Sequence, residues 1–387
     1  MRIVYLLTSL GVGGAEKQAL AVAERMAKRG HTVAVLVLMP RLPEEWPTAV
    51  RTFHLDMRKT PAGAFNGFRR GRSFLREFQP DLIHSHSFHA NIFARLLRVA
   101  GPPFAGPPFA RLSFVVLSTI HNIYEGRWGR MLAYRFTDSL SRRTVAVSEA
   151  AAERFIRLKA VPPRKCSVIL NGIDVDSFAP EANRRDSTRL KMGIATDSAN
   201  FIWLAVGRLA PAKDYPNLLR AFAAVSAKRP DAQLWIAGDA RGDERNPLDA
   251  LAKELGIDKA VRWLGLRRDM PALLDAADAF VSGSAWEGMP LAVGEAMAME
   301  KPVVATDVGG VRELVGNKGV GEAGVIVPAK DSAALADAML ATMRQSREVL
   351  AARGRAARER ILRHFSIDAT ADRWEALYES LIGNRKQ

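Results

Sequence analysis

The sequence predicts an α/β protein made of two Rossmann-like domains with parallel sheets, and three observations support that prediction. The chain has 387 residues, which is more than one hydrophobic core usually supports. Each half begins with an apolar strand, a loop that contains glycine and a helix, at residues 3–29 and again at 201–228. Residues 279–306 then read as strand, polar turn, helix and strand, which is the βαβ unit of a parallel sheet.

The first half continues with further apolar segments that read as strands. We expect them at residues 31–38, 81–83, 114–119, 143–148 and 165–170. The loop after the first strand carries Gly11, Gly13 and Gly14, so the G-x-G-x-x-G fingerprint of dinucleotide-binding proteins is absent. The end of the second strand, near residue 38, also lacks the acidic residue that such proteins have there. Both observations argue against a nicotinamide-dependent enzyme.

A polar span at residues 180–200 separates the two halves, and the second half again alternates strands with helices. The amphipathic end of the chain, residues 366–383, has Trp374, Leu377, Tyr378 and Leu381 at helical spacing. The other elements expected in this half are strands at 201–206, 234–238, 260–264, 279–281, 303–306 and 325–327, and helices at 215–228, 269–277, 291–300, 332–345 and 353–363.

Three histidines follow strands of the first half. His84 and His86 come after the strand 81–83, and His121 comes after the strand 114–119. No carboxylate or cysteine accompanies them locally, so we expect no metal site. His121 could also be a loop residue whose ring is bonded to backbone.

Two cations of the second half lie where an anion would bind. Arg208 and Lys213 lie in the loop after the strand 201–206 and before the helix 215–228. Two positive charges next to the free N–H groups of a helix start suit a diphosphate. The alternative is a solvated loop with two exposed bases.

Two carboxylates flank the turn after the strand 279–281. Glu287 lies in the turn, and Glu295 lies eight residues further on, inside the expected helix. The N–H groups of the helix start point to an anion, and they belong to residues 288–291 apart from Pro290. Together these groups could hold a charged molecule rich in hydroxyls. A surface glutamate and an unrelated glutamate on a helix face are the alternative.

The stretch EGMPLAVGEAMAMEKPVVATDVGGVREL and the run G-R-L-x-x-x-K, which begins at Gly207, resemble the signatures of the retaining nucleotide-sugar glycosyltransferases of the group 1 family (family four). The resemblance implies the GT-B fold, in which two Rossmann-like domains with parallel sheets face a cleft. It implies that Glu287 contacts the donor sugar and that Glu295 binds the ribose. Arg208 and Lys213 would hold the nucleotide diphosphate.

The resemblance extends to weaker elements along nearly the whole chain. It implies that His121 lies against the transferred sugar, and that the NGID turn at residues 171–174 marks the domain crossing. The expected domains are therefore 1–171 on the acceptor side, with the helix 366–387 packed back on it, and 172–365 for the nucleotide sugar. The further donor-binding residues implied are Gly13, Gly14, Leu266, Arg267, Gly288, Met289, Pro290 and Leu291.

The net charge of +15 is confined to the first half. Residues 1–171 hold 26 Lys and Arg against 11 Asp and Glu, whereas the remaining residues hold 30 of each kind. A partner with negative charge is therefore expected on the first half. Residues 57–79 mix arginines with phenylalanines, which favours an anionic membrane surface over nucleic acid. Phenylalanines in the core beneath a solvated basic face are an equally good interpretation.

The sequence thus predicts a metal-independent glycosyltransferase without a cofactor, and the resemblance implies that it retains the anomeric configuration. We expect it to move a sugar from a nucleotide-diphosphate sugar, most simply a UDP-sugar, to a glycan or lipid-linked acceptor in cell-surface polysaccharide or lipopolysaccharide synthesis. The lone cysteine, Cys166, and the lack of an apolar run of about 20 residues suit a cytoplasmic protein that is peripheral to the inner face of the membrane. A nucleotide-sugar epimerase of the same fold and a basic nucleic-acid-binding protein remain alternatives.

Overall fold

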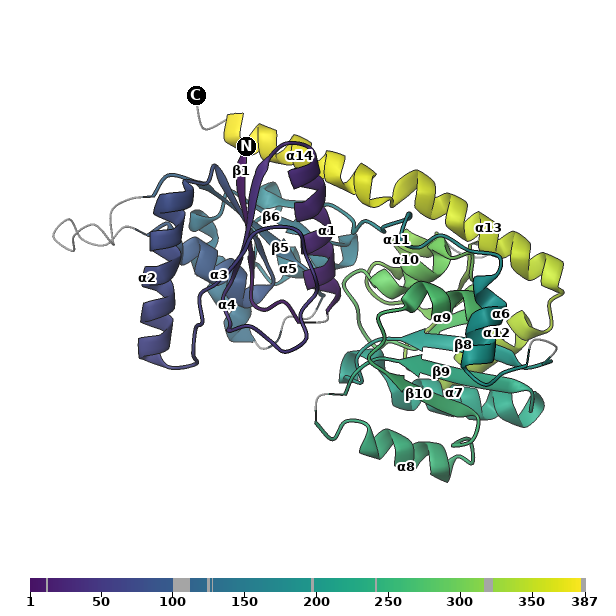
Figure 1. Ribbon diagram of the computed structural model, residues 1–387. Coiled ribbons are helices and arrows are strands. Elements are labelled where there is room, and N and C mark those ends of the chain that lie inside the picture. Colours follow the sequence, from purple (N-terminus) through teal and green to yellow (C-terminus); the bar gives the residue numbers. More distant parts are fainter. Residues whose placement is uncertain are drawn as a thin grey trace. The chain divides into compact units, whose positions relative to one another are not determined.

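The computed structural model describes residues 1–387 except 12, 100–111, 124–125, 127, 196–197, 241, 317–322 and 384–387. The chain separates into two compact units (Figure 1). The first unit comprises Met1–Gly172 and Ile367–Gln387, and the second comprises Ile173–Ser366. Each unit is an α/β domain with a parallel sheet, as the sequence predicts.

The sheet of the first unit has the strand order β3-β2-β1-β4-β5-β6-β7. Its strands are β1 (Arg2–Leu7), β2 (Thr32–Val37), β3 (Thr52–His54), β4 (Leu82–His86), β5 (Val115–Ile120), β6 (Arg143–Ala146) and β7 (Cys166–Val168). Its helices are α1 (Gly14–Lys28), α2 (Pro61–Phe78), α3 (Phe88–Leu97), α4 (Trp128–Thr137), α5 (Glu149–Arg157) and α14 (Ile367–Gly383).

Both faces of this sheet are buried. Successive side chains along a strand point to opposite faces, and each face packs into its own apolar cluster. On β1, Ile3 and Tyr5 belong to the cluster that α1 and α14 cover. Val4 belongs to the opposite cluster, which α2 and α3 cover. Charge reinforces the first layer, since Arg25 of α1 pairs with Asp368 of α14 at 2.8 Å. The helix α14 is therefore part of the first unit.

The sheet of the second unit has the strand order β10-β9-β8-β11-β12-β13. Its strands are β8 (Phe201–Val206), β9 (Ala232–Ala237), β10 (Val261–Gly265), β11 (Ala279–Ser282), β12 (Val303–Thr306) and β13 (Val325–Val327). Its helices are α6 (Arg184–Lys191), α7 (Tyr215–Lys228), α8 (Asn246–Glu254), α9 (Met270–Ala276), α10 (Leu291–Ala298), α11 (Val311–Val315), α12 (Ser332–Met343) and α13 (Arg347–His364).

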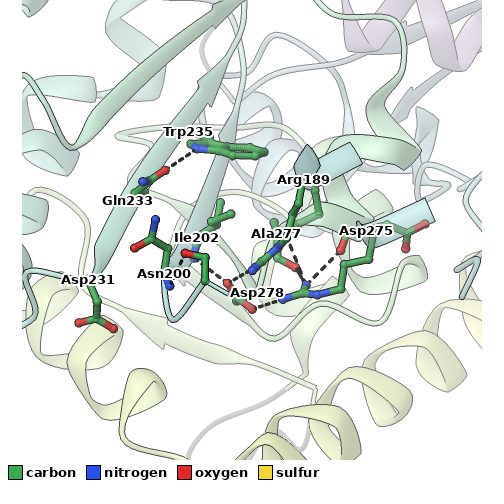
Figure 2. Close-up of polar contacts among 12 residues, drawn as sticks. Arg189, Asn200, Ile202, Asp231, Gln233, Trp235, Asp275, Ala277 and Asp278 are labelled. Atoms are coloured by element: carbon green, nitrogen blue, oxygen red, sulfur yellow. Dashed lines mark hydrogen bonds and ion pairs between the residues drawn. The ribbon is translucent and has the colours of Figure 1, made fainter. Parts of the chain in front are cut away.

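Ion pairs fix the amino-terminal edge of this second sheet (Figure 2). Asp278, just before β11, accepts from the backbone N–H of Ile202 at 2.7 Å. The same carboxylate pairs with Arg189 at 2.7 Å and with Arg185 at 2.5 Å, both from α6. Because Arg189 is nearly fully buried, its charge depends on this partner. This carboxylate thus connects β8 and β11 at their amino-terminal ends, opposite the edge formed by their carboxyl ends.

Some elements of the structure differ from those expected from the sequence or were not expected at all. The polar span 180–200 contains the helix α6, whose arginines are anchored by Asp278 and by backbone carbonyls. Residues 246–254, to which the sequence assigned no helix, form α8. The strand expected at 81–83 continues through His84 and His86, because hydrogen bonds satisfy these rings inside the domain. Cys166 lies on the edge strand β7 and is half-buried.

In the basic segment 57–79, most of which forms α2, two of the phenylalanines have a core role. Phe74 and Phe78 are buried in the cluster beneath α2, whereas Phe65 is exposed. The phenylalanines near the end of α2 therefore belong to the core, whereas Phe65 near its start faces solvent. Within the described ranges, every helix is either too short or too polar to cross a bilayer.

Candidate active site

The centre of the second sheet is a topological switch point. From β8 the chain builds β9 and β10 on one side, and then returns to build β11, β12 and β13 on the other. Ligands of doubly wound sheets bind at the carboxyl ends of the strands that flank such a point. The loop after β8 carries Arg208 and Lys213, and the loop after β11 carries Glu287. The cations and carboxylate predicted from the sequence therefore lie at adjoining strand ends.

These two loops are bonded to each other. The N–H of Ala285 donates to the carbonyl of Ala212 at 2.8 Å. Lys213 Nζ lies 2.6 Å from Glu287 Oε1, with side-chain exposures of 23% and 12%. Ser284 Oγ donates to the same carboxylate oxygen at 2.7 Å. Glu287 is thus held by one cation and one hydroxyl, whereas Arg208 is exposed to solvent.

The turn that carries Glu287 rests on a pair of glycines from the loop after β12. Gly309 has φ +52°, and a Cβ there would lie 2.3 Å from the carbonyl oxygen of Glu287 and 2.5 Å from that of Gly288. The N–H of Gly310 donates to the carbonyl of Gly288 at 2.6 Å. Sequence reasoning assigned no role to these two glycines. The two consecutive glycines within the sequence EGMPLAVGEAMAMEKPVVATDVGGVREL were the feature from which this role could have been predicted.

The start of α10 provides the next part of the site. Pro290 is the N-cap residue and Leu291 the first helical residue, while Gly288 and Met289 are buried in the turn before them. Glu295 lies one turn into this helix and is 7% exposed. A carboxylate so enclosed requires polar partners, and Glu295 has at least one such interaction.

Two of the implied donor-binding residues, Leu266 and Arg267, lie further from the switch point. Leu266 and Arg267 follow β10, the edge strand two places from β8. Arg267 makes a bidentate pair with Asp269, at 2.8 and 2.6 Å. Hydrogen bonds from Arg267 are the main cause that lowers the pKa of Asp269. The side chain of Arg267 is therefore already paired with Asp269.

The first sheet has its own switch point, between β1 and β4. Gly13 and Gly14 follow β1, and Gly13 is the N-cap residue of α1. His86 is the last residue of β4, and His121 follows β5 directly. The predicted glycines and histidines of this domain therefore lie at the carboxyl edge of one sheet.

Hydrogen bonds connect the histidines. His86 Nδ1 lies 2.8 Å from His121 Nε2. His84 is bonded through both nitrogens, Nδ1 to Tyr378 Oη at 2.7 Å and Nε2 to Thr119 Oγ1 at 2.6 Å. Burial lowers the pKa of His121 to about 4 and holds those of His84 and His86 well below the usual value. All three rings are therefore neutral near pH 7.

The sequence favoured His121 over the other two histidines as a site residue. In the structure His121 contacts His86. The two residues lie at the ends of different strands, so no local sequence pattern predicts this contact. Parallel pairing of β4 with β5 was the available signal, because it sets His86 opposite Thr119, two residues before His121. Across the described part of the chain, no group of three His, Cys, Asp or Glu side chains is arranged to hold a metal ion.

Comparison with known proteins places both domains in described families. Residues 187–360 match the family model "Glycosyl transferases group 1", and residues 12–177 match "Glycosyltransferase Family 4". The lipopolysaccharide core biosynthesis mannosyltransferase LpsB of Rhizobium meliloti is 32% identical over 64% of this chain and 72% of that protein. An Escherichia coli UDP-Gal:alpha-D-GlcNAc-diphosphoundecaprenol alpha-1,3-galactosyltransferase is 29% identical over 80% of this chain and 78% of that protein.

Solved structures share the fold across nearly the whole chain. Sucrose-phosphate synthase from Thermosynechococcus elongatus has a TM-score of 0.83 at 21% identity, covering 99% of this chain and 100% of that one. Anabaena Alr3699/HepE in complex with UDP and glucose has a TM-score of 0.82 at 22% identity, covering 98% and 100%. These likenesses establish the architecture of two Rossmann-like domains.

Proposed function

Because this chain belongs to the group 1 glycosyltransferases, we propose that it transfers a hexose from a nucleotide-diphosphate sugar with retention of anomeric configuration. A UDP-sugar is the donor that we favour, since the galactosyltransferase relative is named for UDP-galactose and HepE was solved with UDP. The acceptor that we propose is a glycan or lipid-linked glycan of cell-surface polysaccharide or lipopolysaccharide synthesis. The names of the two curated relatives support that assignment.

The observation that carries the donor proposal is the cationic loop at the switch point of the second sheet. Arg208 is exposed and free to reach a ligand, and Lys213 lies 2.6 Å from Glu287 at the neighbouring strand end. In the proposed complex both cations bind the diphosphate, and Glu287 turns to hydroxyls of the donor sugar. Glu295, buried in α10, binds the ribose. Fixed cations stabilise the charge that grows on the leaving diphosphate, which is the task that a metal performs in other transferases.

The reaction that we propose is a displacement on one face of the sugar. The bond between the anomeric carbon and the diphosphate oxygen breaks, and a bond from that carbon to the acceptor oxygen forms. The acceptor proton passes to the departing phosphate oxygen. In the first domain, His121 is the residue that we place against the transferred sugar.

Calorimetry with UDP, GDP and ADP, followed by a transfer assay, tests this proposal. Arg208→Ala should weaken binding of the preferred diphosphate by about 1.5–3 kcal/mol, the size of a charge-assisted hydrogen bond. Arg220→Ala removes an exposed arginine of α7 and should leave binding unchanged. Transfer should survive exhaustive EDTA treatment.

Three results would contradict the proposal. Equal binding by the Arg208→Ala and Arg220→Ala proteins would remove the diphosphate role. Complete loss of transfer in EDTA that magnesium or manganese restores would overturn the metal-free mechanism. An altered sugar formed without any acceptor would favour the epimerase.

We also propose that the first domain works on an anionic membrane surface. The excess charge of +15 lies in residues 1–171, whereas the cations assigned to the donor lie in the neutral half. An exposed apolar face accompanies this charge on α4, where Trp128 is 74% exposed and Phe136 is 77% exposed. These residues are eight positions apart and share one face of the helix. Exposed Arg135 lies beside them.

Co-sedimentation with vesicles tests the membrane proposal. The protein should pellet with anionic and not with neutral vesicles, and 1 M salt should release it, because the Debye length falls to about 3 Å. A Trp128→Ala, Phe136→Ala double variant should bind about thirtyfold more weakly, since each ring buries apolar surface worth on the order of 1 kcal/mol. Leu190→Ala, an exposed apolar residue of α6, is the matched control. Equal pelleting with both vesicle types, or none with either, would remove the proposal.

A further inference from the structure

His86 is buried among aromatic rings and has a single hydrogen bond among the described residues. Its ring centroid lies 4.1 Å from that of His84 and 5.9 Å from that of Tyr5. Nδ1 contacts His121 Nε2 at 2.8 Å, while Nε2 is buried and has no hydrogen-bond partner in the described part of the chain. The ring is therefore fixed in place and directs one nitrogen at His121.

The position of the proton on His86 follows from this burial. Because burial lowers the pKa of both rings, each carries one N–H at neutral pH. A proton on His86 Nε2 would be a buried donor without an acceptor, which proteins avoid more strictly than an unused acceptor. The proton on Nδ1 instead donates to His121 Nε2. In that arrangement His121 must carry its own proton on Nδ1.

We infer that His86 is a positioning residue that holds neutral His121 in the Nδ1–H tautomer, so that His121 donates a hydrogen bond to an oxygen of the transferred sugar and does not act as a base. The inference rests on the proposed function for the placement of the sugar. The basic nitrogen of His121 is occupied by His86. The acceptor proton must then pass to another group, which agrees with the departing phosphate as its destination.

His84 supports His86 and connects it to the C-terminal helix. Both nitrogens of His84 are bonded, to Tyr378 of α14 and to Thr119 of β5. Tyr378 Oη is in turn 3.0 Å from Tyr5 Oη. These bonds fix the ring against which His86 packs. His84 therefore has no nitrogen left for a ligand, whereas His121 retains Nδ1.

The test combines the histidine tautomer with steady-state kinetics, in the full-length protein labelled with ¹⁵N-histidine. Long-range ¹H–¹⁵N spectra should show His121 protonated at Nδ1 in the wild type without any ligand. His86→Leu should produce a mixture of tautomers, lower kcat by about ten- to a hundredfold and leave the donor KM within about twofold. His86→Asn places an amide N–H near the position of Nδ1 and should restore most of both properties. His89→Leu, an exposed neighbour, is the control.

Two outcomes would overturn the inference. One is a wild-type His121 protonated at Nε2, and the other is a His86→Leu protein with an unchanged His121 tautomer. The wild-type and His86→Asn spectra decide the matter even if His86→Leu does not fold. The spectra need no turnover, so a correct tautomer in a protein that transfers no sugar would refute the proposed function and leave the His86 assignment intact.

Discussion

Replacing Lys213 by alanine is expected to lower kcat/KM for the donor by about a hundred- to a thousandfold, the size seen when one preorganised electrostatic group is removed. Two effects combine. The diphosphate loses a cation at the switch point of the second sheet. Glu287, whose side chain is 12% exposed, also loses the ammonium group 2.6 Å away and, among the residues that the structure describes, keeps the hydroxyl of Ser284 as its partner. Without the neutralising ammonium group, the negative charge of Glu287 repels the phosphates of the donor and weakens its binding.

A double-mutant cycle separates these effects. Glu287→Gln removes the carboxylate charge, so Lys213→Ala should weaken diphosphate binding less in that background than in the wild type. Lys228→Ala, an exposed lysine near the end of α7, is the control for general loss of positive charge. If the Lys213→Ala and Lys228→Ala proteins bound and turned over the donor equally well, the switch point would not be the diphosphate site.

The sequence predicts the architecture because the evidence for each sheet is local. Buried parallel strands read as short apolar runs between turn residues, and β8 and β12 are of this kind. The carboxyl ends of such strands meet at one edge, so Arg208 and Glu287 could be assigned to the same edge of the sheet from the sequence alone. Predicting the strands and their order along the chain requires only the spacing of apolar residues and the positions of turns, and it does not require knowledge of side-chain contacts.

The remaining features depend on contacts between residues distant in sequence. Lys213 and Glu287 are 74 positions apart, and only the packed loops show that they form an ion pair. His84 and His86 read as loop residues because they are polar, yet hydrogen bonds to Tyr378 and His121 let β4 include them. The helix α6 was missed for the same reason, since its buried Arg189 is stabilised by Asp278. A prediction based on hydropathy places polar residues in loops, so it fails where such residues are buried and form hydrogen bonds inside a domain.

Gly309→Ala is expected to abolish donor binding and to destabilise the second domain by more than the backbone strain alone. An alanine at φ +52° costs about 1–2 kcal/mol in the left-handed region. Its Cβ would also lie 2.3 Å from the carbonyl oxygen of Glu287, an impossible contact with backbone. The turn must therefore move, and it carries Glu287 away from Lys213 and the start of α10 away from the phosphates.

Gly256→Ala is the matched control, because Gly256 has φ +68° and no atom within 4 Å of the added Cβ. It should cost only the backbone strain of about 1–2 kcal/mol and leave diphosphate binding unchanged. Urea unfolding gives the stability of each variant, and calorimetry gives its affinity for the nucleoside diphosphate. The difference between the two alanines measures the contact of Gly309 with the Glu287 turn. Equal stability losses together with intact binding in both variants would show that this contact does not hold the turn in its binding position.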